Sequence, residues 1–354
     1  MQDRFLDYRQ RLINLITTTK ESIETPCSFL DKQSEFNIPI IVILGATASG
    51  KTEYARQIFA SDSGSVYSGL GEVISADSMQ VYTGMDIGTA KADLSLQKVL
   101  PHHLISFTQP NKQYCAGDFI DDVKKISKEI ILKNKIPVIV GGTGFYLKSF
   151  IQGLPKTPQS DSEYRKILHQ RLEKEGSSVL FAELQKVDPV TANKIHRNDY
   201  YRILRGLEVF YSSGIPLSKY EIKSETRKGF SFCILGIKRP RSEVYLRIEK
   251  RVKSMMNEGL PLEFKRLLEN GYTKDDPGMQ AIGYREFFMI PNWQENLNSV
   301  ENLIIHDTKK YAKKQETFFK LISNVNWIDT KDDDSNKKII EYIDNSLINE
   351  SSFT

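Results

Sequence analysis

GATASGKT, at residues 45–52, follows the apolar run IPIIVIL at residues 38–44. The eight residues fit the pattern G-x-x-x-x-G-K-[ST], a loop whose backbone N–H groups hold phosphates. The alternative is an ordinary turn between a strand and a helix. Because a strand precedes the loop and EYARQIFA (53–60) continues as a helix, the pattern favours a phosphate site. This site would comprise Gly45, Ala46, Thr47, Ala48, Ser49, Gly50, Lys51 and Thr52.

Two side chains of this loop carry the predicted chemistry. Lys51 would bring a positive charge to the phosphates, and the Thr52 hydroxyl is the expected ligand for Mg²⁺. The pattern therefore predicts a diphosphate or triphosphate ligand together with a magnesium ion, and it leaves the reaction open.

Apolar strands alternate with amphipathic helices in the first half of the chain. We expect strands at residues 39–44, 73–77 and 136–140, with helices at 51–60 and 117–134. This alternation predicts an α/β fold of the phosphate-loop NTPase type, with a parallel sheet and helices on both faces. Ligands on such sheets bind at the carboxyl ends of the strands, so the segments that follow these strands are the candidate site.

Changes in composition predict five segments. An N-terminal extension of helix and linker (1–36) precedes the phosphate-loop core (37–158), and a helical insertion (159–230) follows. The chain then returns to the core through strand 232–237 and further helices (231–328), and it ends in an acidic, loosely ordered tail (329–354). Seven acids and three lysines give that tail a net charge of −4, so residues 1–328 carry +8. A moderately basic body is compatible with a polyanionic partner without requiring one.

Composition excludes several classes of protein. Hydrophobic residues make up 40% of the chain and charged residues 27%, which is typical of a globular protein. We expect no membrane segment, because no apolar run approaches the roughly 20 residues that a span needs. The first residues carry acids and arginines where a signal peptide needs an apolar core. The three cysteines lie more than eighty positions apart, so we expect a reducing, cytoplasmic setting.

Asp77 is the last residue of the predicted strand 73–77 and lies in ISADSMQVYTGMDIGTAK (74–91). A carboxylate at this edge could hold Mg²⁺ through water or act as a general base. The equally plain alternative is a helix N-cap. The glycines and Asp86 in TGMDIGTAK predict a tight polar loop that closes over the ligand.

A third strand end is followed by GGTGFYL (141–147). The strand carries no terminal carboxylate of the Walker B kind, whereas Thr143 offers a hydroxyl donor for a leaving diphosphate oxygen. The alternative is a glycine turn that leads into a helix. PHHL (101–104) and His306 lack partners at metal-ligand spacing and are not assigned a role.

Basic helices follow in the second half of the chain. Arg202 and Arg205 share one helix face, and Arg247 and Arg251 share another. HDTKKYAKKQETFFK (306–320) mixes five lysines with aromatic residues, a combination that suits RNA. Solvated or simply amphipathic helices are the alternatives for all three segments.

Six segments together resemble the tRNA dimethylallyltransferase (tRNA isopentenyltransferase) family of bacterial type. In chain order these are GATASGKT, ISADSMQVYTGMDIGTAK, PHHL, GGTGFYL, RILRGLEV and QAIGYRE, with matching spacing from about Pro39 to Trp327. Members transfer a dimethylallyl group from its diphosphate to N6 of adenine 37 of tRNA, beside the anticodon. The resemblance implies dimethylallyl diphosphate and the tRNA anticodon stem-loop as partners, Mg²⁺ as cofactor and a monomeric enzyme.

The resemblance also implies roles for individual residues. Asp77 would be the general base, Thr47 to Thr52 would bind the diphosphate, and Arg247 (rather than Arg251) would reach it as well. Family positions that touch tRNA match Asp77, Ser78, Met79, Gln80, Thr143, Arg165, Tyr201, Arg202, Ile203, Leu204, Arg205, Gln280, Ala281, Ile282, Gly283, Tyr284, Arg285, Lys313, Lys314, Gln315 and Lys320. Thr143 and Arg247 complete the implied catalytic set with Asp77.

The chain departs from the family pattern in a few places. KKQETFFK is often richer in arginine and tryptophan, and lysine lacks the bidentate phosphate recognition of arginine. The first 36 residues match no family segment. A phosphate-loop small-molecule or nucleotide kinase is the alternative function, and a non-catalytic RNA-binding module is a third class that would need neither Asp77 nor Lys51.

Overall fold

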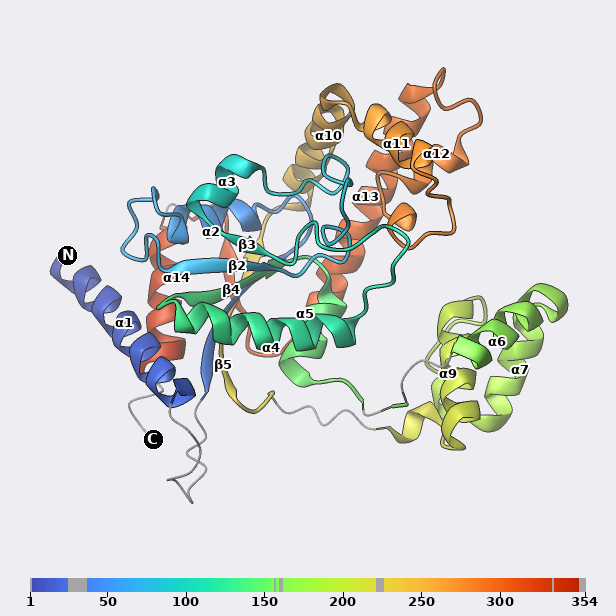
Figure 1. Ribbon diagram of the computed structural model, residues 1–354, viewed down its shortest axis with the longest axis horizontal. Helices are drawn as coiled ribbons and strands as arrows, with labels where there is room; N and C mark the ends of the chain where they lie inside the picture. The colour runs from blue at the N-terminus through green and yellow to red at the C-terminus, as the bar shows by residue number, and fades with distance from the viewer. Residues whose placement is uncertain are drawn as a thin grey trace. The chain divides into compact units, whose positions relative to one another are not determined.

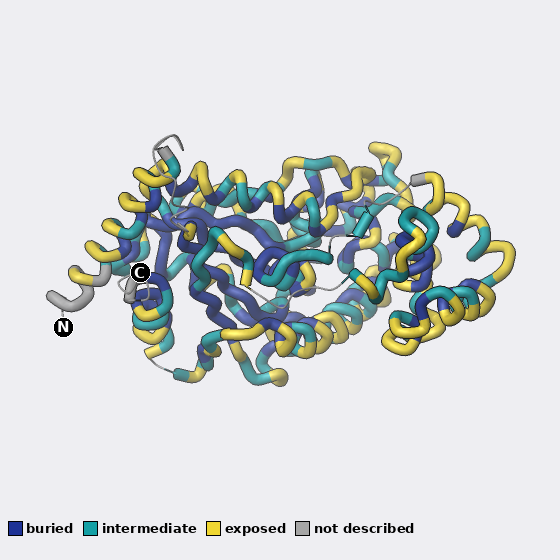
Figure 2. Tube along the Cα trace, turned by 90° about the horizontal axis from the view of Figure 1, so that it is seen from below, coloured by how far each residue is buried: buried dark blue, intermediate teal, exposed yellow. Residues whose placement is uncertain are grey.

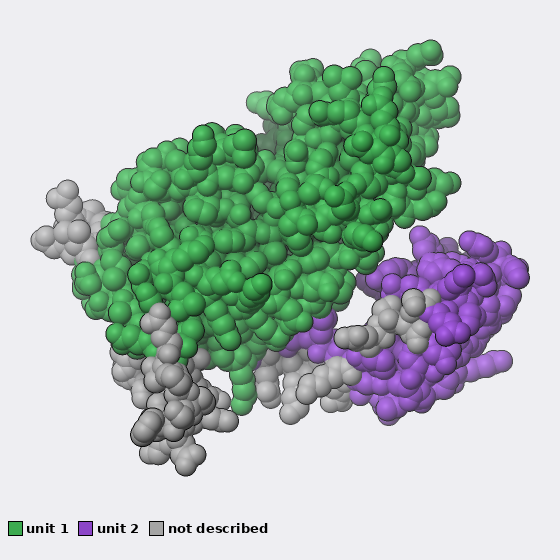
Figure 3. All heavy atoms as spheres, in the orientation of Figure 1, with its two compact units in different colours: residues 1–151, 227–354 green, residues 152–226 purple. Residues whose placement is uncertain are grey.

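The computed structural model describes residues 2–24, 37–155, 157–158, 162–220, 226–332 and 334–349. The chain divides into two compact units, residues 1–151 with 227–354 and residues 152–226 (Figure 3). The second unit begins and ends a few residues before the predicted insertion 159–230. Arg227 stays with unit 1 because its N–H donates to the Ile151 carbonyl (2.7 Å) and its Nε to the Phe150 carbonyl (2.6 Å).

A six-stranded sheet forms the centre of unit 1 (Figure 1). Its strands are β1 (Ile38–Gly45), β2 (Gly71–Ser75), β3 (His102–His103), β4 (Ile136–Gly141), β5 (Phe230–Lys238) and β6 (Asn326–Asp329). Their order is β3-β2-β4-β1-β5-β6, and every neighbouring pair is parallel. The predicted α/β fold with a parallel sheet is therefore confirmed, with two short edge strands that the sequence did not predict.

β1 lies inside the sheet, between β4 and β5, and all of its residues are therefore buried. Such strands read as continuous apolar runs, as 38–44 does, and the dark blue of the trace marks this core (Figure 2). Leu44 pairs with Gly141 of β4, and Gly45 pairs with Ile237 of β5. This register brings the carboxyl ends of three strands to one edge, where the phosphate-loop pattern begins.

Helices flank the sheet on both faces, with α2 and α4 on opposite sides (Figure 1). The helices around the sheet are α2 (Lys51–Phe59), α3 (Leu94–Val99), α4 (Ala116–Leu132) and α5 (Gly144–Gln152). A second group follows β5: α10 (Arg241–Glu258), α11 (Leu260–Glu269), the 3-10 turn Gly278–Gln280, α12 (Arg285–Met289) and α13 (Leu297–Phe319). Among the described residues, no helix is long and apolar enough to cross a membrane.

Helices at both ends of the chain pack against unit 1. The helix predicted in the N-terminal extension forms as α1 (Gln2–Glu24), which buries Leu12 and Ile16. The expectation of a loosely ordered tail is wrong for residues 335–349, which form α14 (Ser335–Ile343) and a π-helical turn (Asp344–Asn349). α14 buries Ile339, Ile340 and Ile343, an apolar face that the preceding run of acids obscures.

Unit 2 is a helical bundle, as predicted for the insertion. It contains α6 (Ser162–Glu175), α7 (Ser177–Val187), α8 (Pro189–Ala192), α9 (Tyr200–Ser213) and the 3-10 turn Leu217–Lys219. Its own apolar core is formed mainly by Leu168, Leu180, Leu184, Ala192, Ile203, Leu204 and Leu207.

Candidate active site

The loop between β1 and α2 has the backbone shape that the pattern predicts. Gly50 has φ of 100° and Ala48 has φ of 60°, so the chain turns tightly before Lys51 opens α2. Ser49 N–H donates to the Ala46 carbonyl (3.2 Å) within the turn. A side chain at Gly50 would be strained in this region of φ, which explains why the pattern requires glycine there.

A cavity of about 340 Å³ lies beside this loop, at the carboxyl ends of β1, β2 and β4. Its polar lining comes from the loop, from the residues after β2 and from α10 and α13, and its apolar lining from the same two helices. The lining includes Thr47, Lys51, Thr52, Asp77, Ser78, Met79, Gln80, Gly88, Thr89, Ala90, Gly142, Ile248, Arg251, Val252, Met255, Gln280, Ala281, Ile282, Arg285, Ile304, Thr308, Tyr311 and Gln315. The structure thus brings together the phosphate loop, Asp77 and the QAIGYRE segment, as the sequence predicts.

Lys51 and Arg251 give the cavity its positive charge. Lys51 Nζ donates to the Ala46 carbonyl at 2.8 Å. Burial and then the neighbouring Arg251 charge lower the pKa of Lys51 to about 8, and the Asp77 charge opposes the shift. The pKa of Arg251 is lowered as well. Burial and the Arg247 charge lower it, and the Asp77 charge opposes the shift. Two basic groups and one carboxylate therefore lie within electrostatic reach of one another.

Arginines from outside the loop hold its backbone. Arg247 Nε donates to the Ala48 carbonyl (2.9 Å), and Arg251 reaches the Thr47 hydroxyl (Nη1–Oγ1, 3.4 Å). Arg239, which follows β5, donates from Nε to the Ser49 carbonyl (3.1 Å) and was not among the predicted site residues. Of the α10 pair, Arg251 lines the cavity, while Arg247 is exposed and is not part of the lining.

Asp77 follows β2, and the helix N-cap that the sequence left as an alternative is not formed, because residues 78–84 form turns and no helix. Its Oδ1 accepts the Met79 N–H at 2.9 Å, which fixes the turn that begins there. It also lines the cavity, where its charge acts on Lys51 and Arg251. One carboxylate oxygen therefore fixes the local turn, and the second is not needed for that turn.

Thr143 supports this segment from the neighbouring strand end. Its Oγ1 accepts the Ser78 N–H at 3.0 Å, and its own N–H donates to the Ala76 carbonyl at 3.1 Å. The predicted donation to a leaving diphosphate oxygen remains a prediction. The contacts that the structure gives Thr143 hold the residues on either side of Asp77.

Gln315 is 5% exposed and bridges two loops of the site. Its Oε1 accepts the Thr47 N–H (2.8 Å), and its Nε2 donates to the Gly142 carbonyl (2.8 Å). It lies on the face of α13 that also presents Ile304, Thr308 and Tyr311 to the cavity. This bridging role differs from the predicted contact with tRNA, because both ends of the amide are already bonded to main chain.

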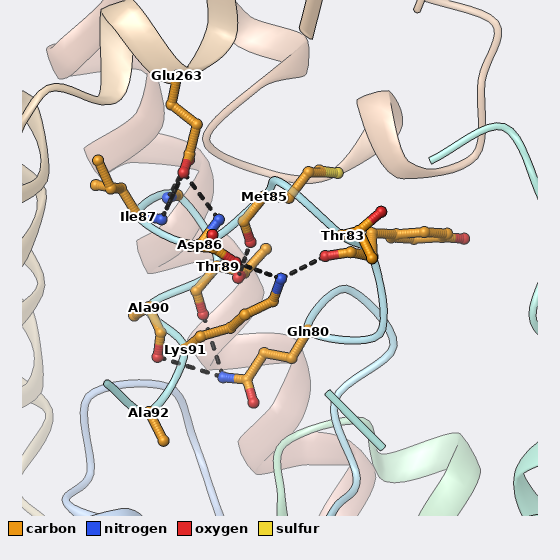
Figure 4. Close-up of polar contacts among 12 residues, drawn as sticks. Gln80, Thr83, Met85, Asp86, Ile87, Thr89, Ala90, Lys91, Ala92 and Glu263 are labelled. Carbon is orange, nitrogen blue, oxygen red and sulfur yellow. Dashed lines mark hydrogen bonds and ion pairs between the residues drawn. The ribbon is translucent and has the colours of Figure 1, made fainter. Parts of the chain in front are cut away.

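Glu263 of α11 is a further residue that sequence reasoning missed. Its carboxylate accepts hydrogen bonds from the backbone of residues 86–88 and from Tyr284, as Figure 4 shows for the loop. No local signal marks it, because its partners lie about 175 positions away in the chain. Gln80 likewise bonds to the loop backbone: its Nε2 donates to the carbonyls of Thr89 (3.2 Å) and Ala90 (3.4 Å).

The predicted RNA contacts of unit 2 differ in accessibility. Tyr201 and Arg202 are exposed, Arg202 with 66% of its side chain in solvent. Arg165 and Arg205 both lie beside Glu208, at 3.6 and 3.2 Å. The side chains of Ile203 and Leu204 are buried in the core of this unit, and contact of these two positions with tRNA stays a prediction.

The predicted RNA contacts of unit 1 also divide into two groups. Gln280, Ala281, Ile282 and Arg285 line the cavity, whereas Gly283 and Tyr284 are buried behind it. Arg285 pairs with Glu286 (2.9 Å) and Asp307 (2.6 Å), and these partners raise its pKa against the effect of burial. Lys313, Lys314 and Lys320 are exposed on or beside α13.

The described residues offer few side-chain ligands for a metal ion. The described residues contain no group of three or more His, Cys, Asp or Glu side chains that could hold one. Mg²⁺ bound with a diphosphate needs only one or two protein oxygens, since substrate and water supply the others. The Thr52 hydroxyl, at the first turn of α2 and on the cavity wall, is compatible with that role. His103 instead pairs with Glu72 of β2 (2.8 Å).

Three comparisons place this geometry among known proteins. Residues 80–321 match the family described as IPP transferase. The chain is 38% identical over 306 residues to the tRNA dimethylallyltransferase of Acetivibrio thermocellus (85% of this chain, 95% of the relative), and 38% identical over 298 residues to that of Borreliella burgdorferi (83% and 94%).

Solved structures agree with these relatives. The tRNA isopentenylpyrophosphate transferase of Bacillus halodurans superposes with a TM-score of 0.62 at 32% identity, covering 89% of this chain and 98% of its own. A eukaryotic dimethylallyltransferase acting on tRNA superposes with a TM-score of 0.70 at 27% identity, covering 85% and 77%.

Proposed function

The chain belongs to the IPP transferase family, and on this premise we propose that it transfers a dimethylallyl group from dimethylallyl diphosphate to N6 of adenine 37 in tRNA. Diphosphate is the leaving group. One observation supports this reaction above the others: a carboxylate, Asp77, shares a 340 Å³ cavity with the cationic phosphate loop. The nucleophile needs a base such as this carboxylate, and the allylic diphosphate needs the positive charge of the loop.

The phosphate loop serves the leaving group. Cleavage of the allylic C–O bond leaves positive charge on the dimethylallyl carbons and negative charge on the diphosphate, so donors aimed at the diphosphate stabilise the transition state. The loop N–H groups, Lys51 and the positive end of α2 supply these donors. Between the two arginines of α10 we propose Arg251 in place of Arg247, because only Arg251 lines the cavity.

Asp77 serves the nucleophile. The N6 amine of adenine is weak because its lone pair is delocalised into the ring, so a base that accepts its proton as the C–N bond forms is useful. The turn at Asp77 is fixed by Met79 and by the contacts of Thr143 with Ala76 and Ser78. The acceptor adenine must leave the tRNA stack to reach this cavity, at a cost of about a few kcal/mol.

Mg²⁺ bound at the Thr52 hydroxyl would neutralise charge on the diphosphate. In this proposal Thr52 and the neighbouring loop orient the diphosphate oxygens, and Lys51 brings a positive charge to them. A magnesium titration of turnover in Thr52→Ala measures the contribution of the hydroxyl, and a titration unchanged from wild type removes Thr52 from the metal site.

The remaining proposals concern the partner and its setting. A buried site reaches one nucleotide, so surrounding basic surface must hold the anticodon stem-loop through its phosphates. Exposed Arg202, Lys313 and Lys314 are the proposed contacts. We further propose a monomer in the cytoplasm, the setting that the three widely spaced cysteines favour.

The experiment is an incubation of the protein with unmodified tRNA, dimethylallyl diphosphate and Mg²⁺, followed by mass analysis of the nucleosides. The expected product is N6-dimethylallyl adenosine, formed together with one diphosphate for each group transferred. The Asp77→Asn variant is the matched control. Transfer of the γ-phosphate of ATP without any modified nucleoside would instead identify the alternative, a phosphate-loop kinase.

A further inference from the structure

The carboxylate of Glu263 lies at the junction of two walls of the cavity. It is 3% exposed, and it accepts the backbone N–H groups of Asp86 (2.9 Å), Ile87 (3.0 Å) and Gly88 (3.1 Å). Consecutive N–H groups that point at one anion form a concave binding site for it, and here the anion is a side chain of the protein itself. Figure 4 shows Glu263 reaching these amides from α11.

The same carboxylate holds the second wall through Tyr284. The Tyr284 hydroxyl donates to Glu263 Oε1 at 2.7 Å. Burial, followed by the charge of Glu263, raises the pKa of Tyr284, so the phenol remains a donor. The ring of Tyr284 also packs on the loop, since a Cβ at Gly88 would lie 2.6 Å from it. Glu263 therefore ties the residue that follows Gln280–Gly283 to the loop at Gly88.

The loop that Glu263 holds is connected to the strand end that carries Asp77. Gly88, Thr89 and Ala90 line the cavity. The carbonyls of Thr89 and Ala90 accept from Gln80 Nε2, and Gln80 Oε1 accepts from Ser75 Oγ at 2.9 Å. Ser75 is the last residue of β2, two positions before Asp77. Direct contacts thus run from α11 to the end of β2.

A third set of contacts closes the loop on itself. Lys91 Nζ bonds to the Tyr82 carbonyl and to Asp86 Oδ1 (2.7 Å), and its side chain is buried. The loop is therefore held by two side chains: Lys91 bonds to Tyr82 and Asp86, and Glu263 bonds to the backbone of residues 86–88 (Figure 4). Among the residues that the structure describes, the hydrogen bonds of Glu263 do not extend to the phosphate loop, whose backbone is held by Gln315, Arg239 and Arg247.

From this arrangement we infer that Glu263 is a positioning residue that sets the spacing between the 86–90 loop and the 280–285 segment, and with it the fit of the acceptor adenine next to Asp77. The inference rests on the proposed function, because it assigns the nucleotide side of the cavity to these two walls. It predicts that Glu263 acts on the tRNA reaction and leaves the binding of dimethylallyl diphosphate unchanged.

The main test is Glu263→Gln, with Glu269→Gln as matched control. The control residue lies on the same helix and makes only a surface pair with Lys265 (3.8 Å). Glu263→Gln should lower kcat/KM for tRNA by about tenfold or more, as expected when hydrogen bonds to a buried charge are lost. The Kd for dimethylallyl diphosphate should change by less than about twofold in both variants. An equal loss toward both substrates would overturn the inference.

A second measurement does not depend on activity. Amide hydrogen exchange of Asp86, Ile87 and Gly88 should be slow in the wild-type protein and in Glu269→Gln, and faster in Glu263→Gln. Unchanged protection in Glu263→Gln would contradict the assigned hydrogen bonds. If the wild type formed no modified nucleoside, the proposed function would fail while this exchange result still decided the role of Glu263 in holding the loop.

Tyr284→Phe provides the milder variant if Glu263→Gln does not fold. It removes one donor to the carboxylate and retains the ring that packs on Gly88. A selective loss in kcat/KM for tRNA, smaller than that of Glu263→Gln, supports the inference. Wild-type kinetics in Tyr284→Phe together with unchanged amide exchange at residues 86–88 would overturn it.

Discussion

The side-chain oxygen of Gln315 accepts the Thr47 backbone N–H at 2.8 Å, across 268 positions of sequence. Through its Nε2 the same side chain holds the Gly142 carbonyl, so one amide joins the phosphate loop to the end of β4. α13 thereby fixes the shape of a loop that sequence reasoning treats as local. The site depends on the second half of the chain for its backbone geometry.

Replacing Gln315 should test this bridge. Gln315→Ala removes the partners of the part-buried Thr47 N–H and the buried Gly142 carbonyl, which should lower the free energy of unfolding by about 2 kcal/mol. Gln315→Glu keeps an acceptor for Thr47 but places a buried carboxylate oxygen against the Gly142 carbonyl, so it should also lower the stability. Urea unfolding curves measure both variants. Equal stability of Gln315→Ala and wild type would show that the bridge contributes nothing.

Asp77→Asn should separate the two roles of Asp77. The amide oxygen retains an acceptor for the Met79 N–H, while the base is lost. We therefore expect native stability and tRNA binding, with kcat reduced by about a hundredfold or more. Single-turnover rates with saturating substrates measure the chemical step. Normal turnover in Asp77→Asn would show that another group accepts the proton.

The lowered pKa of Lys51 predicts a pH dependence. In the free enzyme, Lys51 is charged below about pH 8 and loses its proton as the pH rises through that value. The kcat/KM for dimethylallyl diphosphate should therefore fall above pH 8, by at most about tenfold per pH unit. A bound diphosphate favours the charged form, so the corresponding fall in kcat should lie at higher pH.

Lys51→Arg is the control for this profile. Arginine keeps its charge throughout the range, so the fall near pH 8 should disappear even if the variant binds more weakly. Profiles of kcat/KM between pH 6.5 and 9.5 make the comparison. A fall at the same pH in Lys51→Arg would assign the titration to another group.

The two arginines of α10 should differ in effect. Arg251 lines the cavity, whereas Arg247 donates to the Ala48 carbonyl and is not part of the lining. Arg251→Ala should weaken binding of dimethylallyl diphosphate by about tenfold or more, and Arg247→Ala by clearly less. Calorimetric Kd values in the absence of tRNA provide the measurement. The reverse order would restore Arg247 as the diphosphate ligand.

Unit 2 offers a similar pair. Arg202 extends into solvent, whereas Arg205 bonds to the Thr157 hydroxyl and the Pro158 carbonyl, each at 3.0 Å. Arg202→Ala should raise the Kd for tRNA and reduce the slope of log K against log salt concentration by about one unit at most. Arg205→Ala should mainly lower stability. Salt titrations of tRNA binding distinguish the variants, and an unchanged slope in Arg202→Ala would make that arginine a solvated surface group.

Local patterns predicted the central strands, the phosphate loop and Asp77, because each depends on residues that are adjacent in sequence. The two-residue β3 and four-residue β6 were missed, since so few residues carry no periodic signal. Glu263 and the bridging role of Gln315 were missed for a different reason. Their partners lie more than 170 positions away, and only the folded chain brings them together.

α14 shows a further limit of reading composition. Its isoleucines follow a run of acids that dominates the average charge of the tail, while the helix repeat determines which side chains face unit 1. Conversely, the basic stretches of unit 2 and α13 predicted charge correctly but did not distinguish arginines in solvent from arginines already paired, such as Arg205 and Arg285.

The position of β1 between β4 and β5 has a consequence during synthesis. β1 is translated first among the strands, yet one of its edges pairs with a strand that ends only at residue 238. The ribosome must therefore make all of unit 2 before the central strand is covered on both edges. At about 5–20 residues per second the nascent chain would expose an apolar edge for roughly ten seconds or more, a period in which chaperones are the expected protection.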